Sequence, residues 1–349
     1  MKIKLTKQEK NWILYDVGNS AFTLLAATIL PIYFNYIAGK QGLSDVQYLA
    51  YWGYAVSIAT LLTALAGPVF GTVADTKGYK KPVFTIALGI GTIASVALGF
   101  AKYWLAFLVV FVIAKVGYSV TLVFYDSMLV DVTLEDRMDE VSSQGYAWGY
   151  IGSCVPFVIC LLVVLNAGKI GITMEIAMMV SFVIITVWWV IMTLPLLRTY
   201  HQKYYVEKKQ HAFSESFKRI GITLKNVKKE KKVFLFLLAF FFYIDGVYTI
   251  IDMATAYGSA LGLSSTGLLL ALLLTQIVAF PFAIIFGRLA KKYSAEKLIT
   301  VCIVAYLGVA IFAIFLHYQW QFWVLAVWVG MFQGGVQALS RSYFTKIIP

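Results

Sequence analysis

Residues 83–101 read VFTIALGIGTIASVALGFA, a stretch of nineteen residues that contains no charged side chain. An α-helix needs about 20 predominantly apolar residues to cross the hydrocarbon core of a bilayer. A helix satisfies its backbone polar groups internally, as hydrocarbon demands, and the sequence lacks the short alternating segments of a membrane β-barrel. This stretch therefore predicts a transmembrane helix.

Nine further stretches of similar composition occur along the 349 residues. The full set predicts ten membrane-spanning helices at residues 12–38, 49–74, 83–101, 104–130, 145–166, 174–197, 233–259, 264–287, 298–316 and 321–345. The first stretch follows a basic tail but is about twice as long as the apolar region of a cleaved signal peptide, so we expect it to be retained. The predicted fold class is an all-α membrane protein.

The composition argues against the soluble classes of protein. Apolar residues make up 60% of the chain and charged residues 13%, whereas about 25% of the residues in an ordinary soluble domain are charged. So few charges cannot cover a water-facing surface of this size. A soluble enzyme, a nucleic-acid binder and a disordered scaffold are therefore not expected.

No motif for catalysis or for a cofactor accompanies the apolar stretches. The sequence contains no HExxH, no GxSxG, no nucleotide-binding loop and no pair of redox cysteines. Its histidines lack the spacing of metal ligands, and its cysteines lie inside apolar stretches. We expect no enzymatic activity, no catalytic residue, no metal site and no cofactor.

The distribution of Lys and Arg predicts the topology. With the N-terminus in the cytoplasm, the inner tail and loops hold 24 of the 29 basic residues, and the outer loops hold only Lys40, Lys102 and Lys169. The polar stretch 198–232 alone holds 11 of them and carries a net charge of +8. The positive-inside rule and anionic lipid account for the overall charge of +12, so we expect no nucleic-acid partner.

The chain also shows signs of an internal duplication. Gly71, Ala74, Lys81 and Trp104 recur exactly 216 positions later as Gly287, Ala290, Lys297 and Trp320. Pseudo-symmetric halves of this kind are characteristic of secondary transporters. We expect a six-helix bundle at residues 1–197, a basic cytoplasmic connector at 198–232, and a second bundle at 233–349 that holds four helices.

One loop carries a family signature. Between the second and third spans the chain reads GTVADTKGYKK, with Gly71, Asp75, Gly78, Lys80 and Lys81 at the informative positions. This pattern resembles the signature loop of the major facilitator superfamily, and the resemblance implies a role for these residues in gating and topology. The corresponding loop of the second half is degenerate, with Lys291 where the Asp would stand.

Three further segments narrow the resemblance. The chain opens its first span with WILYDVGNSA at 12–21, begins its fifth near VSSQGYAWGYIG at 141–152, and carries GGVQALSRS at 334–342. These segments resemble a facilitator subfamily that contains the vacuolar amino-acid effluxers linked to autophagy and uncharacterised bacterial permeases. The resemblance implies twelve helices, of which this chain supplies ten. We therefore expect a sequence truncated after its tenth helix.

Six ionisable residues lie inside the predicted spans, where a charge is costly and usually faces a cavity or a partner. They occur on the first, fourth, seventh and tenth spans: Asp16, Lys115, Asp126, Asp245, Asp252 and Arg341. In the facilitator fold that the resemblance implies, these four helices line the central cavity. We therefore predict a pathway for substrate and protons formed by these six residues together with Asn19, Tyr118, Tyr248 and Gln337.

Two pairs within this set carry specific predictions. Asp126 and Arg341 lie at similar depth near the cytoplasm, so we predict that they pair across the halves as a gate. Asp245 and Lys115 lie near the midplane, where Asp245 is predicted to carry a proton and a permanent ion pair is the structural alternative. Asp16 has the alternative of contacting the first turn of its helix, and Arg341 that of reaching the headgroups.

The sequence thus predicts a secondary transporter in a cell membrane that moves a small polar solute by alternating access. Proton coupling is part of this expectation, and the resemblance favours amino-acid efflux by a monomer. A receptor or scaffold that transports nothing is the alternative, and a flux assay in liposomes distinguishes the two.

Overall fold

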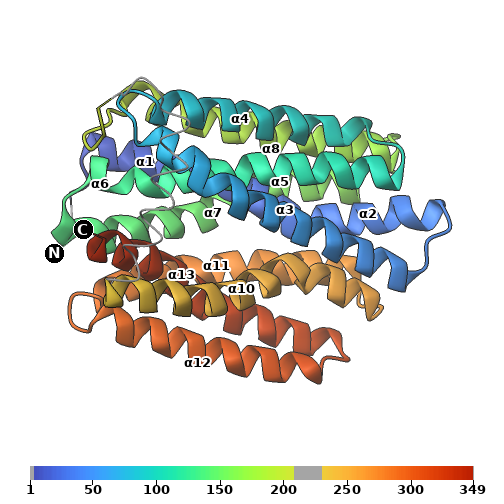
Figure 1. The fold of residues 1–349 in the computed structure, drawn as a ribbon. Helices are drawn as coiled ribbons and strands as arrows, with labels where there is room; N and C mark the ends of the chain where they lie inside the picture. Colours follow the sequence, from blue (N-terminus) through green and yellow to red (C-terminus); the bar gives the residue numbers. More distant parts are fainter. Residues whose placement is uncertain (1–3, 208–229, 349) are drawn as a thin grey trace.

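The computed structural model describes residues 4–207 and 230–348. Over these residues it contains ten helical spans long and apolar enough to cross a membrane, which confirms the predicted all-α fold and span count. They run through α1 (Lys7–Ala27) with α2 (Ile29–Lys40), α3 (Asp45–Ala74), α4 (Lys80–Ala97), α5 (Trp104–Ser127), α7 (Met138–Leu165), α8 (Met174–Thr199), α10 (Lys231–Ala260), α11 (Ser265–Leu289), α12 (Ala295–Ile314) and α13 (Gln319–Ile347). A short helix, α6 (Leu129–Val132), follows α5 (Figure 1).

Several helices begin before the apolar stretch that predicted them, because polar residues cap their first turns. Thr6 and Glu9 form a capping box, and α1 therefore starts at Lys7 rather than at residue 12. Ser44 and Gln47 do the same for α3, which starts at Asp45. Hydropathy locates the part of a helix that lies in lipid, whereas the capping residues determine where the helix begins.

The first span is interrupted between α1 and α2 at Thr28. Pro31 follows three residues later and has no backbone N–H with which to continue the helical ladder to Ala27. The carbonyl of Ala27 instead accepts a hydrogen bond from the hydroxyl of Thr255 on α10, at 2.5 Å. The break thus frees a backbone acceptor that joins the first span to the seventh.

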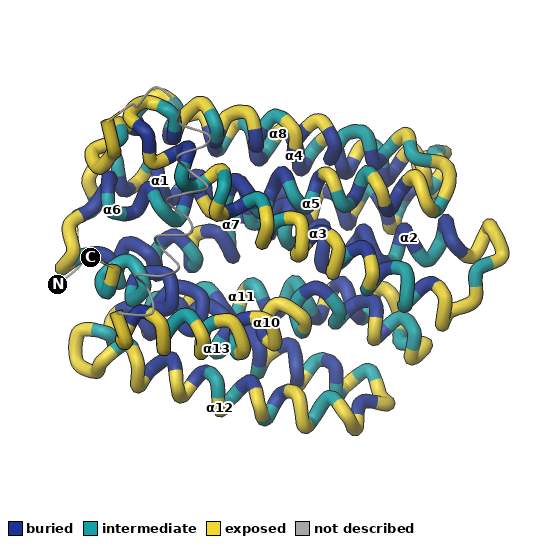
Figure 2. Tube along the Cα trace, in the orientation of Figure 1, coloured by how far each residue is buried: buried dark blue, intermediate teal, exposed yellow. Residues whose placement is uncertain are grey.

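Two large hydrophobic clusters, and a third small one between α7 and α11, hold the helices together. The larger is built mainly from α1 to α8 and contains Trp12, Trp52 and Trp189, and the smaller is built from α10 to α13. Buried positions follow the surfaces where helices meet (Figure 2). The two clusters match the division into residues 1–197 and 233–349, and we propose these boundaries for the two bundles. Of the predicted connector at 198–232, residues 208–229 lie outside the described residues.

Close backbone contact joins α4 to α5. A Cβ atom added at Gly117 would lie 2.6 Å from the backbone nitrogen of Gly91, so no larger residue fits there. Small residues allow such an approach between membrane helices. With α4 and α5 packed in this way, Lys115 and Asp126 of α5 lie toward the second half of the molecule, where both side chains find partners.

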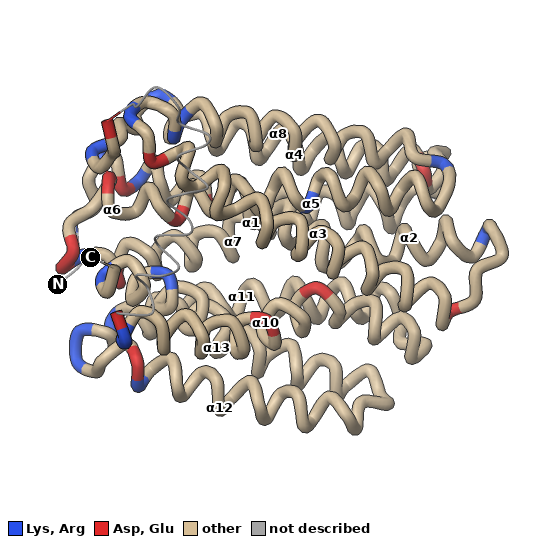
Figure 3. Tube along the Cα trace, viewed as in Figure 1, with Lys and Arg blue, Asp and Glu red and all other residues tan. Residues whose placement is uncertain are grey.

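Charged residues gather at the end of the molecule where both described ends of the chain lie (Figure 3). The loops α3–α4, α6–α7 and α11–α12 lie at this end, as does the start of the connector (Figure 1). We refer to it as the terminal end. The sequence predicts that this end faces the cytoplasm.

Candidate functional site

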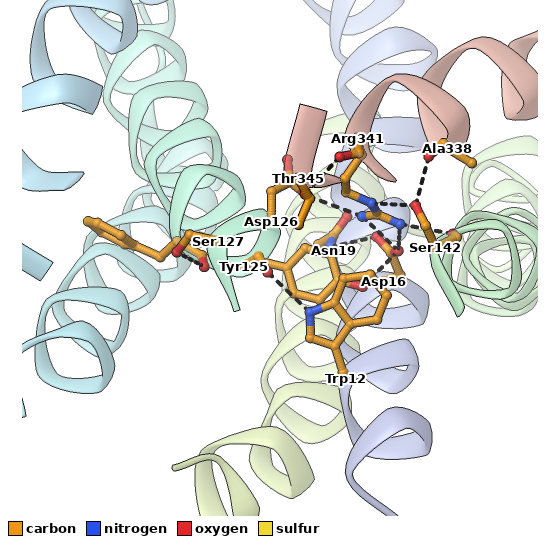
Figure 4. Close-up of polar contacts among 11 residues, drawn as sticks. Trp12, Asp16, Asn19, Tyr125, Asp126, Ser127, Ser142, Ala338, Arg341 and Thr345 are labelled. Atoms are coloured by element: carbon orange, nitrogen blue, oxygen red, sulfur yellow. Dashed lines mark hydrogen bonds and ion pairs between the residues drawn. The ribbon is translucent and has the colours of Figure 1, made fainter. Parts of the chain in front are cut away.

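Arg341 on α13 makes five hydrogen bonds inside the protein, one for each N–H of its guanidinium group. Nη1 donates to Asp126 Oδ1 at 3.1 Å and to Asp16 Oδ2 at 3.4 Å. Nη2 donates to the same oxygen of Asp16 at 3.3 Å and to the carbonyl of Ser142 at 2.9 Å, and Nε donates to the Ser142 hydroxyl at 2.8 Å. We call these four residues the Arg341 cluster (Figure 4).

The Arg341 cluster joins the two halves of the molecule. Asp16, Asp126 and Ser142 belong to α1, α5 and α7 of the first half, and Arg341 to the second. The predicted pair of Asp126 and Arg341 is therefore present. Asp16 does not contact the first turn of its helix, because it lies beyond that turn of α1. Arg341 does not reach the headgroups, because its side chain is only 5% exposed.

Aromatic rings surround the guanidinium group and complete its environment. Its central carbon lies 4.3 Å from the centre of the Tyr146 ring, 4.6 Å from that of Trp12 and 5.3 Å from that of Tyr125. Tyr125 also donates its hydroxyl to Asp16 Oδ2 at 2.8 Å, and Trp12 donates to the carbonyl of Tyr125 at 3.1 Å. Ring faces attract a cation, so this packing stabilises the charge of Arg341 away from water.

The three sequence segments at 12–21, 141–152 and 334–342 meet at this cluster. They supply Asp16, Ser142 and Arg341, respectively. Gly145 of the second segment packs against the carboxylate of Asp16, and a Cβ atom at Gly149 would lie 2.6 Å from Ser20 Oγ. The glycines of α7 therefore let α1 approach closely enough for the charged groups to meet.

Two cavities lie on either side of the cluster. The first has a volume of about 270 Å³ and is lined by residues of both halves, among them Asp16, Asn19, Tyr118 and Gln337. The second has a volume of about 670 Å³, and its lining includes Asp126, Arg341 and the start of the connector. Each carboxylate of the cluster thus borders a different cavity.

The other predicted pathway residues have defined positions around the first cavity. Asn19 donates to Asp16 Oδ1 at 3.3 Å, Tyr118 shares a hydrogen bond of 2.5 Å with Thr23, and Gln337 accepts one of 2.6 Å from Tyr150. Tyr248 on α10 lines both cavities. The fold therefore brings nine predicted residues near the cavities or into contact across the halves: Asp16, Asn19, Lys115, Tyr118, Asp126, Tyr248, Asp252, Gln337 and Arg341.

The predicted proximity of Lys115 to Asp245 is wrong. Lys115 Nζ binds Asp252 Oδ1 at 2.7 Å, and both side chains are largely buried. Asp245 is exposed on α10 and lines neither of the two cavities. Asp252 follows Asp245 by seven residues, or about 10 Å along the helix. The way α5 and α10 are offset along their lengths brings Lys115 to Asp252 rather than to Asp245. This offset cannot be read from the position of a residue within its own helix.

We expect Asp252→Asn to reduce the free energy of unfolding by about 3–5 kcal/mol, because it leaves the ammonium group of Lys115 without its counter-ion. Thermal unfolding of the purified protein in detergent measures this loss. The exchange Lys115→Asp with Asp252→Lys is expected to recover part of it, and Asp245→Asn serves as the matched control with little effect. Equal losses in Asp245→Asn and Asp252→Asn would contradict the assignment.

The signature loop lies at the terminal end, where Asp75 and Lys80 line the second cavity together with Asp126 and Arg341. Gly78 has φ of +79°, a conformation that favours glycine, and its N–H donates to Gln202 Oε1 at 3.1 Å. Lys80 is buried and binds Asp131 at 3.4 Å, whereas Lys81 is exposed. Asp75 is the C-cap of α3, and its backbone carbonyl accepts a hydrogen bond from the N–H of Val206 at 2.8 Å. Gly71 is not tightly packed, since no neighbouring atom lies within 4 Å of the position that a Cβ atom would take there.

Asp131 is the centre of these contacts. Besides Lys80, it accepts hydrogen bonds from the hydroxyl of Tyr200 at 2.5 Å and from the backbone N–H groups of Lys203 and Tyr204 at 2.9 and 3.1 Å. Burial, followed by the bond to Asp131, raises the pKa of Tyr200 above its ordinary value, so this phenol remains a neutral donor. The start of the connector is therefore anchored on the signature loop.

Asp131→Asn is expected to destabilise the protein by about 3–5 kcal/mol, since Lys80 would remain buried without its carboxylate. Thermal unfolding in detergent measures the effect. Lys77→Gln is the control, because it removes an exposed pair with Glu207 and is expected to change nothing measurable. An unaltered unfolding temperature in Asp131→Asn would show that this anchor contributes no stability.

Comparison with known proteins places this arrangement in a family. A profile described as "Vacuole effluxer Atg22 like" matches residues 6–136 and 130–349. The chain belongs to the Atg22-like family. It is 44% identical to the "Uncharacterized MFS-type transporter YxiO" of Bacillus subtilis strain 168 over 354 residues, which cover 100% of this chain and 83% of that protein.

More distant relatives agree with this placement. Autophagy-related protein 22 of Eremothecium gossypii is 24% identical over 360 residues, which cover 92% of this chain and 69% of that protein. The xylose transporter XylE from E. coli has the same fold, with a TM-score of 0.59 at 11% identity, covering 98% of this chain and 86% of that structure. This Atg22-like protein is thus a multi-pass membrane transporter of the major facilitator type.

Sequence reasoning missed the residues that complete the Atg22-like site. Ser142, Trp12 and Tyr146 bind or surround Arg341, although all three stand in the segments that carry the family resemblance. It also missed two ion pairs between the halves: Lys291 with Glu140 at 2.5 Å and Lys346 with Asp139 at 2.6 Å. The departure from the signature pattern at Lys291, where Asp is expected, is the sequence feature that could have pointed to the pair with Glu140.

Proposed function

We propose that this Atg22-like protein moves a small polar solute by alternating access, with the Arg341 cluster as the gate at the terminal end. The observation that carries the proposal is the place of the cluster between two cavities, with one carboxylate bordering each. Opening a path between the cavities requires separation of Arg341 from Asp16 and Asp126. The gate would thus be closed by charge pairing and opened when the halves part.

Contacts between the halves on both sides of the first cavity support this proposal. At the terminal end, Lys291 and Lys346 of the second half bind Glu140 and Asp139 at the start of α7. Toward the opposite end, Asn35 donates to Ser259 at 3.3 Å. The pair of Lys115 with Asp252 adds a further contact across the halves.

We further propose that protons drive the transport and that the Arg341 cluster carries them. Two carboxylates share one guanidinium group, so the cluster bears one excess negative charge when both are ionised. Like charges near one another favour the binding of a proton. The Asp126 side chain is 43% exposed beside the second cavity, which gives it a route to protons that Asp16, at 4%, lacks. Asp126 therefore replaces Asp245 as our candidate for the coupling residue.

The remaining features of the proposal rest on the relatives and on the charge distribution. The family description as a vacuole effluxer favours export, and the resemblance favours amino acids as the solute. The basic terminal end favours an orientation in a cell membrane with the N-terminus in the cytoplasm, and the protein would act as a monomer without a catalytic step.

Flux in liposomes tests this function. Purified protein is reconstituted and loaded with amino acids of differing side chains, and their release is followed with and without a pH gradient. We expect release above that of protein-free liposomes, and faster release when a gradient is imposed. Saturable binding without any release would favour the alternative of a receptor or scaffold.

A further inference from the structure

The first cavity has an unusual balance of charge. Among the described residues that line it, Asp16 is the only one with a charged side chain. The rest of the polar lining is neutral and comes from hydroxyl and amide groups, among them Asn19, Gln276, Gln333 and Gln337. The one formal charge on this described lining is therefore negative.

The described lining of the first cavity offers a solute no free cation. Arg341 borders the other cavity, and its five N–H groups are bound to Asp16, Asp126 and Ser142. Lys115 is bound to Asp252 and does not line the first cavity. A carboxylate or phosphate entering the cavity would therefore meet the carboxylate of Asp16 and no unpaired cation on the described lining.

A cation, in contrast, finds several favourable groups. Asp16 receives three hydrogen bonds on Oδ2, from Arg341 and Tyr125, but only the amide of Asn19 on Oδ1. Asn19 itself lines the cavity, so Oδ1 is the oxygen with capacity for another donor. Five tyrosines share the lining, and their ring faces attract an ammonium group: Tyr118, Tyr146, Tyr150, Tyr248 and Tyr257.

Much of the remaining lining of the cavity is apolar. Leu316, Phe322, Leu325 and Val329, from α13 and the segment before it, line it together with Val309 and Ala313 of α12. A branched aliphatic or aromatic group placed there would remove apolar surface from water on both sides. The cavity thus combines a single acid, aromatic rings and an apolar wall.

We propose that the cavity recognises its solute by a protonated amine held at Asp16 and by an apolar body, and that a carboxylate on the solute adds nothing to the affinity. This inference rests on the proposed transport function and specifies the class of solute. It predicts that amines without a carboxylate bind as well as the parent amino acid.

Leucine and its two single-group deletions test the proposal. 3-Methylbutylamine lacks the carboxylate, and 4-methylpentanoate lacks the amine. Isothermal titration of the purified full chain in detergent is expected to give an affinity for the amine at least equal to that for leucine. The affinity for 4-methylpentanoate is expected to be at least tenfold weaker. Binding of the acid as tight as that of the amine, or binding of none of the three, would overturn the proposal.

Two variants locate the recognition. Asp16→Asn is expected to weaken binding of 3-methylbutylamine at least tenfold. Asp245→Asn removes a carboxylate that is exposed on α10 and lines neither cavity, so it is expected to leave the affinity for the amine unchanged. Equal losses in both variants would remove Asp16 as the amine partner.

Release from liposomes distinguishes a failure of the amine proposal from a failure of the proposed transport function. Release of 4-methylpentanoate from liposomes at the rate of leucine would retain a transporter but overturn the amine proposal. Tight binding of the amine with no release of any solute would retain the amine site but overturn the transport function.

Discussion

Replacing Arg341 with Ala is expected to abolish gated transport and to destabilise the protein by about 3–5 kcal/mol, the usual consequence of removing one partner from a buried ionic cluster. Asp16 and Asp126 would be left facing each other without a counter-ion, and the hydroxyl and carbonyl of Ser142 would lose their donors. Repulsion between the two carboxylates then favours separation of the halves at the terminal end.

Chemical labelling measures the opening of this gate. Ser20 lines the first cavity, so a Ser20→Cys reporter is placed in a background whose three buried cysteines are replaced by Ala. Reaction with a membrane-impermeant maleimide from the terminal end is expected to be slow with Arg341 present and at least tenfold faster in Arg341→Ala. Arg341→Lys is the matched variant, and it is expected to be intermediate because an ammonium group has three donors for five acceptor contacts.

The charge exchange Asp126→Arg with Arg341→Asp tests whether these two residues pair directly. If they do, the double variant is expected to label more slowly than either single variant. An exchange that protects the reporter no better than the single changes would show that Arg341 acts through Asp16 and Ser142 alone.

Asp126→Asn is expected to uncouple transport from the pH gradient while leaving exchange of solute intact. Asn keeps the size of the side chain but cannot bind a proton, and the cluster becomes neutral with Asp16 and Arg341 as its charges. Accumulation of solute driven by an imposed pH gradient should therefore fall to the level without a gradient. Exchange of labelled for unlabelled solute, which needs no net proton movement, should continue within about threefold of the unaltered protein.

Asp245→Asn is the control for this experiment, since Asp245 is exposed on α10 and outside both cavities. It is expected to retain accumulation driven by the pH gradient. The opposite pattern, with Asp245→Asn uncoupled and Asp126→Asn coupled, would return the coupling role to Asp245.

The positions of the charged residues could be predicted from sequence, but their partners only in part. An ionisable side chain inside an apolar stretch is conspicuous, and all six of those predicted lie on the spans expected of them. Asp126 was matched with Arg341 because their depths along two helices agree. The same reasoning matched Lys115 with Asp245 and was wrong, because the depth of a residue in its own helix does not describe how two helices are offset or tilted.

The family segments show a similar limit. Their residues could be recognised as a resemblance from sequence, but no physical role followed for Ser142 or for Gly145. In the structure, Ser142 binds Arg341 and Gly145 gives room to the carboxylate of Asp16. Both roles depend on residues far apart in the chain, so local patterns carry no trace of them.

The sequence by itself determined the fold class, the ten spans, the charged end of the molecule and the family, because hydropathy, charge and motif are local properties of the chain. Only the tertiary structure decided that Arg341 is shared by two carboxylates between two cavities, that Lys115 binds Asp252, and that Asp131 anchors the connector. These contacts depend on how helices cross and on their offset along the membrane normal, which packing of the whole molecule sets.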